Sequence, residues 1–318
     1  MAKGRKLKIF SFFAGCGILD LGFEKAGYDI EFVNEFFKPF QDAYIYSRKM
    51  MKIRPPKYGY ANTDVNSYIN ENKHQLEQYI EDAKKDGSLV GFIGGPPCPD
   101  FSIAGKQRGR DGDNGKLSLS YISLLITMKP DFFLFENVKG LWKTARHREF
   151  YEELKVTLKN AGYYLTERLT NSLEFGVPQD RDRILLVGVS EKLLKQEFKG
   201  DDQTLLQFPW ESKMKCSLED IRNEQWPDMT PFVEGSVSEC PDGIEKELTV
   251  QYWFEKNDVE MLIGTSNRKL DSEKCLRFRR VIQTKSHTRG FIGGGIHLLW
   301  LMVITKYTYI PIRQDGYR

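Results

Sequence analysis

The stretch LKIFSFFAGCGILDLGF, residues 7–23, joins an apolar run to a glycine turn and then to a helix-like segment. The run at 7–13 is short, aromatic and bounded by glycine, which favours a β-strand. Gly15 and Gly17 permit a tight turn, and the pattern at 19–26 predicts a helix. A strand that passes through a turn into a helix is the unit from which α/β proteins are built.

The same alternation continues through the first 190 residues. Apolar runs predict further strands at 29–33, 89–95, 131–138 and 183–189, and helical patterns lie at 39–51, 71–83, 117–128 and 148–160. Strands that are apolar throughout are typical of a parallel sheet with helices on both faces. We therefore expect a doubly wound α/β sheet in residues 1–190.

Unusual residues follow the expected strands. The first strand leads into FAGCG, the second into Asn34 and Glu35, the run at 89–95 into GGPPC, and the run at 131–138 into Glu136 and Asn137. Ligands of such sheets bind at the carboxyl ends of the strands. Glu35, at the end of the second strand, suits ribose hydroxyls. Asp64, which ends the shorter segment YANTDV, suits an adenine amino group, and the alternative for each residue is an ordinary surface carboxylate.

Cys98 differs from the other four cysteines, for which burial as a small apolar side chain is the simpler interpretation. Two prolines fix the backbone ahead of it, and the loop 99–116 that follows is rich in glycine and in basic residues that favour a thiolate. A nucleophilic thiol together with the carboxylic acid of Glu136 suits attack on an electron-poor ring. Since the five cysteines are scattered and include no CxxC pair, we expect neither disulfides nor a metal site.

A second polar pattern lies in QDRDR. Gln179, Arg181 and Arg183 alternate there, so an extended conformation places all three side chains on one face. Two arginines beside a thiol and an acid indicate a site for an anionic substrate.

Charge divides the remainder of the chain. Residues 191–265 hold eight Lys and Arg against seventeen Asp and Glu, whereas residues 266–318 hold eleven against three. The basic segment suggests a nucleic acid partner, the alternative being a solvated basic face. We place a domain boundary near residue 190. No apolar run has the length of a membrane span and the beginning lacks the features of a signal peptide, so we expect a cytoplasmic protein without membrane contact.

Four motifs in order resemble those of the DNA (cytosine-5) methyltransferases. They are FAGCG at 13–17, PPCPDFS at 96–102 leading into GKQRG at 105–109, ENV at 136–138, and GVPQDRDR at 176–183. The resemblance covers most of residues 7–190. It implies a Rossmann-like methyltransferase sheet in 1–190, a smaller target-recognition domain in 191–318, and a bacterial enzyme of a restriction-modification system.

The resemblance also implies S-adenosylmethionine as the cofactor. Its contacts would be Phe13, Ala14, Gly15, Gly17 and Leu19 in the glycine turn, Glu35 on the ribose, Phe36 against the adenine, Asp64 and Val65 on the adenine edge, and Pro97 and Leu117 at the methionine end. No metal is implied.

The implied substrate is a cytosine flipped out of double-stranded DNA. Cys98 would attack C6 while Glu136 engages N3, which makes C5 nucleophilic toward the methyl group. Asn137 would order the site. Arg181 and Arg183 would hold the flipped nucleotide, and the loop 99–116 would close over the DNA.

Two departures from the family are visible. Ile18 stands where a second glycine is usual, and neither an FPD-type motif nor a GN(A/S)V motif follows the target-recognition region. A truncated or frame-shifted chain is the explanation we favour, followed by one subunit of a split enzyme that needs a second polypeptide. A permuted motif order is the third explanation, and the N-terminal position of FAGCG argues against it. The alternative to an active methyltransferase is thus a truncated or split-subunit member that is inactive alone, acting only as a DNA-binding chain or with its partner. A tRNA cytosine methyltransferase of the same family is a further alternative.

Overall fold

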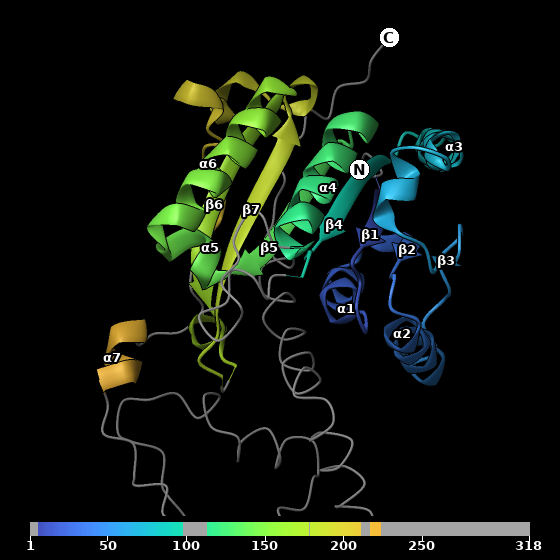
Figure 1. The fold of residues 1–318 in the computed structure, drawn as a ribbon, viewed down its shortest axis with the longest axis horizontal. Helices are drawn as coiled ribbons and strands as arrows, with labels where there is room; N and C mark the ends of the chain where they lie inside the picture. Colours follow the sequence, from blue (N-terminus) through green and yellow to red (C-terminus); the bar gives the residue numbers. More distant parts are fainter. Residues whose placement is uncertain (1–5, 98–112, 178, 211–216, 224–318) are drawn as a thin grey trace, which may run out of the picture. The chain divides into compact units, whose positions relative to one another are not determined.

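The computed structural model describes residues 6–97, 113–177, 179–210 and 217–223 (Figure 1). Its strands are β1 (Leu7–Phe12), β2 (Asp29–Asn34), β3 (Tyr60–Ala61), β4 (Leu89–Gly94), β5 (Phe132–Val138), β6 (Tyr163–Asn171) and β7 (Asp182–Ser190). The α-helices are α1 (Ile18–Lys25), α2 (Lys38–Met50), α3 (Lys73–Lys84), α4 (Asp113–Met128), α5 (Lys139–Lys143), α6 (Ala145–Asn160) and α7 (Leu218–Asn223). The five helices and five strands predicted in the first 190 residues are therefore confirmed, with small shifts at their ends.

The strands of the described residues form one sheet in the order β3-β2-β1-β4-β5-β7-β6 (Figure 1). β1 pairs in parallel with both β2 and β4, and β4 pairs in parallel with β5. The chain moves outward from β1 to β2 and β3 and then returns to the other side of β1 through β4. This arrangement confirms the predicted doubly wound α/β sheet, and it collects the carboxyl ends of β1, β2, β4 and β5 along one edge.

β7 runs antiparallel to β5, so the sheet is mixed. In this register Val138 lies opposite Arg183 and Glu136 lies opposite Leu185. The beginning of β7 therefore lies at the same edge as the ends of β4 and β5. The sequence pattern did not predict β6, the edge strand next to β7. Its residues YYLTERLTN include charged side chains and are only partly buried, so they do not form an apolar run.

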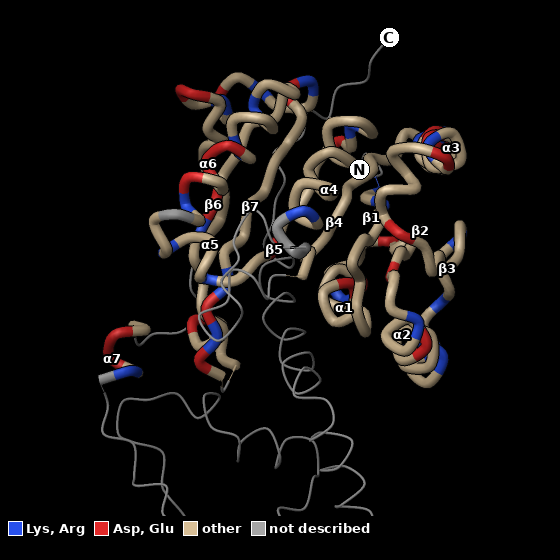
Figure 2. Tube along the Cα trace, viewed as in Figure 1, with Lys and Arg blue, Asp and Glu red and all other residues tan. Residues whose placement is uncertain are grey.

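Helices cover both faces of the sheet (Figure 1). α3, α4 and α6 cover an aromatic core in which alternate strand positions contribute Phe10, Phe12, Phe32, Phe92, Phe133 and Phe135. α1 and α2 pack on the opposite face. Figure 2 shows no Lys, Arg, Asp or Glu on β4, whereas α3 and α6 carry charges of both signs on their solvent sides. This pattern is what a strand buried on both faces requires.

The aromatic residues of β5 fit because glycines face them on the neighbouring strands. Phe132 pairs with Gly91 of β4, and Phe133 pairs with Gly188 of β7. A Cβ atom at Gly91 would lie 2.2 Å from the Phe132 ring, and one at Gly188 would lie 2.1 Å from the Phe133 ring. Because each glycine lacks a side chain, it leaves room for the phenylalanine ring of the residue paired with it.

The chain divides into two compact units. Of the described residues, the first unit holds 6–170 and 182–210, and the second holds 171–181 and 217–223. Residues 191–210 belong to the first unit, where a β-bridge joins Leu165 to Thr204. The predicted domains, 1–190 and 191–318, stay a prediction. Within the described ranges no helix combines the length and the apolar character that crossing a membrane requires.

We predict that Gly188→Ala lowers the free energy of unfolding by about 1–3 kcal/mol, because the new methyl group overlaps the Phe133 ring. Chemical denaturation measures this change. The control is the same substitution in a Phe133→Leu background, where the smaller side chain leaves room for the methyl group. A cost that is equal in both backgrounds would contradict the proposed clash.

Candidate functional site

A left-handed turn follows β1 at the edge where the parallel strands end. Phe13, Gly15 and Gly17 have φ angles of 53°, 56° and 79°. The turn is closed by a hydrogen bond from the Gly17 N–H to the Ala14 carbonyl at 2.9 Å, and the Ala14 N–H donates to the Asn34 carbonyl at 3.2 Å. A Cβ atom at Gly15 would have no neighbour within 4 Å, so the backbone there is open to an approaching group.

Glu35 connects this turn to the end of β2. Its carboxylate accepts hydrogen bonds from the Gly15 N–H at 2.7 Å and from the Phe37 N–H at 2.8 Å. The side chain is 8% exposed. The structure therefore brings Glu35 and the glycine turn together, as expected from their places at the ends of neighbouring strands, while the ligand of Glu35 stays a prediction.

The segment after β3 completes this part of the edge. Asn62 Nδ2 donates to the carbonyls of Glu35 and Phe36, each at 2.7 Å. The Phe36 ring is 70% exposed, so a flat apolar surface is available beside the buried carboxylate. Asp64 accepts a hydrogen bond from the Asn66 N–H at 2.8 Å and caps a short 3₁₀ helix that begins at the buried Val65.

The sequence pattern alone does not single out Asn62. The available signal was an amide side chain directly after an edge strand, at the end where the other strands carry polar groups.

Cys16 lies between the two glycines of the turn and is partly buried. Burial, with a smaller contribution from the negative charge of Glu35, raises the pKa of its thiol to about 11. At neutral pH the thiol is therefore protonated, and Cys16 is a poor nucleophile. This agrees with its interpretation as a small apolar side chain.

An ion pair lies at the ends of the central strands. Arg183 Nε is 2.9 Å from Glu136 Oε1, and both side chains are about 15% exposed (16% and 15%). The two residues are diagonal neighbours across the antiparallel pair of β5 and β7, which lets the long side chains meet. A Cβ atom at Gly95, just after β4, would lie 2.8 Å from Glu136 Oε2, so the glycine leaves room for the carboxylate.

Asn137 points away from Glu136, as alternate residues of a strand do. It is 1% exposed, and its Oδ1 accepts a hydrogen bond from the Val138 N–H at 2.8 Å. Its position suits a structural role next to Glu136.

The remaining predicted residues are placed as follows. Ala14 is buried, Leu19 and Leu117 are partly buried on α1 and α4, and Pro97 is exposed just after β4. Cys98 and most of the loop 99–116 lie outside the described residues.

Arg181 belongs to the second unit. Its carbonyl accepts a hydrogen bond from the Ser172 N–H at 3.1 Å. In the same unit Asp180 accepts hydrogen bonds from Asn171 Nδ2 and from Arg222 Nη2 of α7, each at 2.6 Å. These contacts hold residues 180 and 181 within the second unit. The predicted common face for Gln179, Arg181 and Arg183 stays a prediction.

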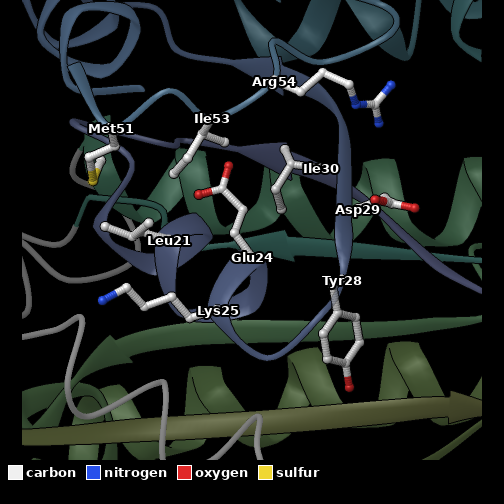
Figure 3. Close-up of a pocket in the computed structure, with 9 residues that line it drawn as sticks. All are labelled: Leu21, Glu24, Lys25, Tyr28, Asp29, Ile30, Met51, Ile53 and Arg54. Atoms are coloured by element: carbon white, nitrogen blue, oxygen red, sulfur yellow. The ribbon is translucent and has the colours of Figure 1, made fainter. Parts of the chain in front are cut away.

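A pocket of about 420 Å³ lies elsewhere, at the amino end of β2 (Figure 3). Its lining residues are Leu21, Glu24, Lys25, Tyr28, Asp29, Ile30, Met51, Ile53 and Arg54. None of the predicted site residues is among them. In the described part of the chain no cluster of three or more His, Cys, Asp or Glu side chains is placed to hold a metal ion.

The edge thus offers two sets of groups. The first combines an open glycine backbone, a carboxylate and an exposed aromatic ring, which together can accept hydrogen bonds from hydroxyls and contact a flat ring. The second is a carboxylate held by a guanidinium, which can orient a polar heterocycle.

Comparison with known proteins adds to this geometry. A family model described as C-5 cytosine-specific DNA methylase matches residues 7–251. The Type II methyltransferase M.NmeDI of Neisseria meningitidis serogroup C is 50% identical over 257 residues, which cover 80% of this chain and 58% of that protein. M.FnuDI of Fusobacterium nucleatum, also a Type II methyltransferase, is 34% identical over 227 residues, covering 70% and 57%. The chain spans little more than half the length of these relatives.

We predict that iodoacetamide modifies Cys16 of the native chain at pH 8 at least about a hundredfold more slowly than it modifies a free cysteine peptide, because so little thiolate is present. Peptide mapping by mass spectrometry follows this residue alone. The rate is expected to rise with pH toward 11 and to reach the free-peptide rate in denaturant. Fast native labelling at pH 8 would show that burial does not control this thiol.

Proposed function

Because the chain belongs to the C-5 cytosine-specific DNA methylase family, we propose that it transfers a methyl group from S-adenosylmethionine to C5 of a cytosine in double-stranded DNA. The observation that carries this proposal is the Glu136–Arg183 pair at the carboxyl edge of the sheet. Gly95 brings the end of β4 against the same carboxylate, and the chain reaches Cys98 three residues later. A thiol, an acid and an arginine are the groups that addition to a cytosine ring requires.

The glycine turn fits the cofactor. Glu35 carries acceptor oxygens for ribose hydroxyls, Phe36 offers an exposed ring for the adenine, and Gly15 leaves its backbone open for the methionine end. Asp64 and Val65 follow on the adenine edge. Pro97, Leu117 and Leu19 are assigned to the remaining contacts. When bound, S-adenosylmethionine supplies an electrophilic methyl group.

The chain's own residues activate the base. The Cys98 thiolate adds to C6 of the flipped cytosine while the acid form of Glu136 donates a hydrogen bond to N3, so the electron pair of the C5–C6 double bond becomes available at C5. After C5 is methylated, the C5 proton passes to water, the C5–C6 double bond re-forms and the Cys98 thiolate leaves C6. Arg183 holds the Glu136 carboxyl group in orientation and reaches toward the cytosine O2, Arg181 holds the nucleotide, and Asn137 orders the strand end.

The relatives support an assignment of the biological setting. M.NmeDI and M.FnuDI are Type II methyltransferases, so we assign this chain to a restriction-modification system acting on DNA in a bacterial cytoplasm. Residues 191–318, with their basic end, are assigned to target recognition, and residues 1–190 to cofactor binding and catalysis.

We predict that the purified 318-residue chain transfers labelled methyl groups from S-adenosylmethionine to C5 of cytosine in mixed-sequence bacterial DNA. Cys98→Ala abolishes the transfer because no group remains to add to C6. Arg183→Lys lowers kcat about tenfold or more, since a single ammonium cannot hold the carboxylate as the planar guanidinium does. Nucleoside analysis of the product measures all three.

Lys143→Gln is the control, because this exposed residue of α5 has no role in the proposed chemistry. Label that survives Cys98→Ala would overturn the mechanism. Methyl label found on tRNA in place of DNA would contradict the assignment of DNA as the substrate. No label from the intact chain, alone or with an added extract of its host, would overturn the proposed activity.

A further inference from the structure

A buried polar cluster lies directly behind the glycine turn, on the face of the sheet that α1 and α2 cover. Its members are Ser11, Asp20, Glu24, Tyr44 and Arg48. Ser11, Asp20, Tyr44 and Arg48 are each at most 2% exposed. The cluster contains none of the residues assigned above to the cofactor or to the base.

Asp20 accepts two hydrogen bonds within the cluster. Ser11 Oγ of β1 donates to Asp20 Oδ1 at 2.8 Å, and the Tyr44 hydroxyl of α2 donates to Asp20 Oδ2 at 2.9 Å. Since Asp20 lies in the first turn of α1, these bonds fix the start of α1 to both β1 and α2.

Arg48 connects the cluster to the turn itself. Its Nη2 donates to the Gly17 carbonyl at 2.6 Å, and its Nε lies 2.8 Å from Glu24 Oε2. The guanidinium carbon lies 4.2 Å from the centre of the Tyr44 ring. The Gly17 carbonyl also accepts the first helical bond of α1, from the Leu21 N–H at 3.0 Å, so both of its lone pairs are used.

The Tyr44 ring also fixes the shape of the turn. A Cβ atom at Gly17 would lie 2.3 Å from two ring carbons of Tyr44 and 3.0 Å from Arg48 Nη2. Position 17 thus requires glycine for two reasons: its φ angle is 79°, and Tyr44 of α2 lies too close for a Cβ atom. Helix α2 thus contacts the turn through the Arg48 hydrogen bond and through packing of the Tyr44 ring.

Stability alone does not explain charges at this depth. Burial raises the pKa of Asp20 and raises that of Glu24 to about 7, with Arg48 opposing both shifts. Well-packed apolar residues commonly serve stability as well as a buried ionic cluster or better. Glu24 also reaches the pocket of Figure 3, where its carboxylate lies among Leu21, Ile30 and Ile53, so one end of the cluster is close to solvent.

We propose that Tyr44 and Arg48 are positioning residues for the cofactor: they hold Gly17 and the start of α1 in the conformation that binds S-adenosylmethionine. This inference rests on the proposed function, because it assigns the turn to that cofactor. Neither side chain contacts the cofactor. Each acts through the Gly17 carbonyl, the Gly17 Cα or Asp20, and a small displacement of such a turn is costly for binding.

The test uses two conservative variants of the full chain. Arg48→Lys keeps the charge but loses the planar fork that reaches Gly17 and Glu24 together. Tyr44→Phe keeps the ring against Gly17 and loses the bond to Asp20. Their matched controls are Arg54→Lys, at a residue whose side chain is 61% exposed, and Tyr46→Phe, at a residue that is 65% exposed.

Calorimetric titration with S-adenosylmethionine and with S-adenosylhomocysteine is made at a temperature where circular dichroism shows every variant folded. We expect the Kd of both to rise roughly tenfold in Arg48→Lys and roughly threefold in Tyr44→Phe, changes that correspond to the loss of one hydrogen bond. Neither control should change. In steady-state assays KM for S-adenosylmethionine should rise while KM for DNA stays constant.

The outcomes separate the two proposals. Wild-type binding with an unchanged Kd in both variants would overturn the positioning role and leave the proposed function standing. A lower kcat with both KM values unchanged would mean that the variants only lose folded protein, and would also overturn it. A wild-type chain that binds neither compound would overturn both proposals together.

Discussion

The antiparallel pairing of β5 with β7 is the constraint on which the candidate site depends. It places the beginning of β7 beside the end of β5, so that Arg183 meets Glu136 across two strands that are far apart in the sequence. A parallel β7 would carry Arg183 to the opposite edge of the sheet. Removing one partner of such a poorly exposed pair leaves an uncompensated charge, at a cost of about 3 kcal/mol or more. The pair is therefore both a structural contact and a polar group that lies against the end of β4.

That pairing in turn depends on space. β5 carries two adjacent phenylalanines that point to opposite faces, and each is received by a glycine on the strand beside it. At the observed spacing a side chain at position 91 or 188 would overlap these rings. The two glycines therefore help to hold β5 between β4 and β7, and β5 and β7 carry Glu136 and Arg183.

The glycine turn has two sides with different contacts. Its front is formed by Gly15, Glu35 and the exposed ring of Phe36, and its back is held by Tyr44 and Arg48 from α2. The front leaves the Gly15 backbone open and the Phe36 ring exposed, whereas Tyr44 and Arg48 on the back bond to Asp20, Gly17 and Glu24. The surrounding structure thus holds a backbone with positive φ angles from one side.

The sequence by itself predicted five strands and five helices of the first 190 residues, because an apolar run or a helical period is a local property of the chain. It also placed Glu35 and Glu136 at strand ends, since in a parallel sheet all strands end at one edge. The tertiary structure alone decided that β7 is antiparallel, that β6 exists as an edge strand, and that Arg183 pairs with Glu136. It alone placed Tyr44 and Arg48 behind Gly17. These contacts join residues 24 to 47 positions apart, and whether they form depends on which elements become neighbours, which local pattern does not specify.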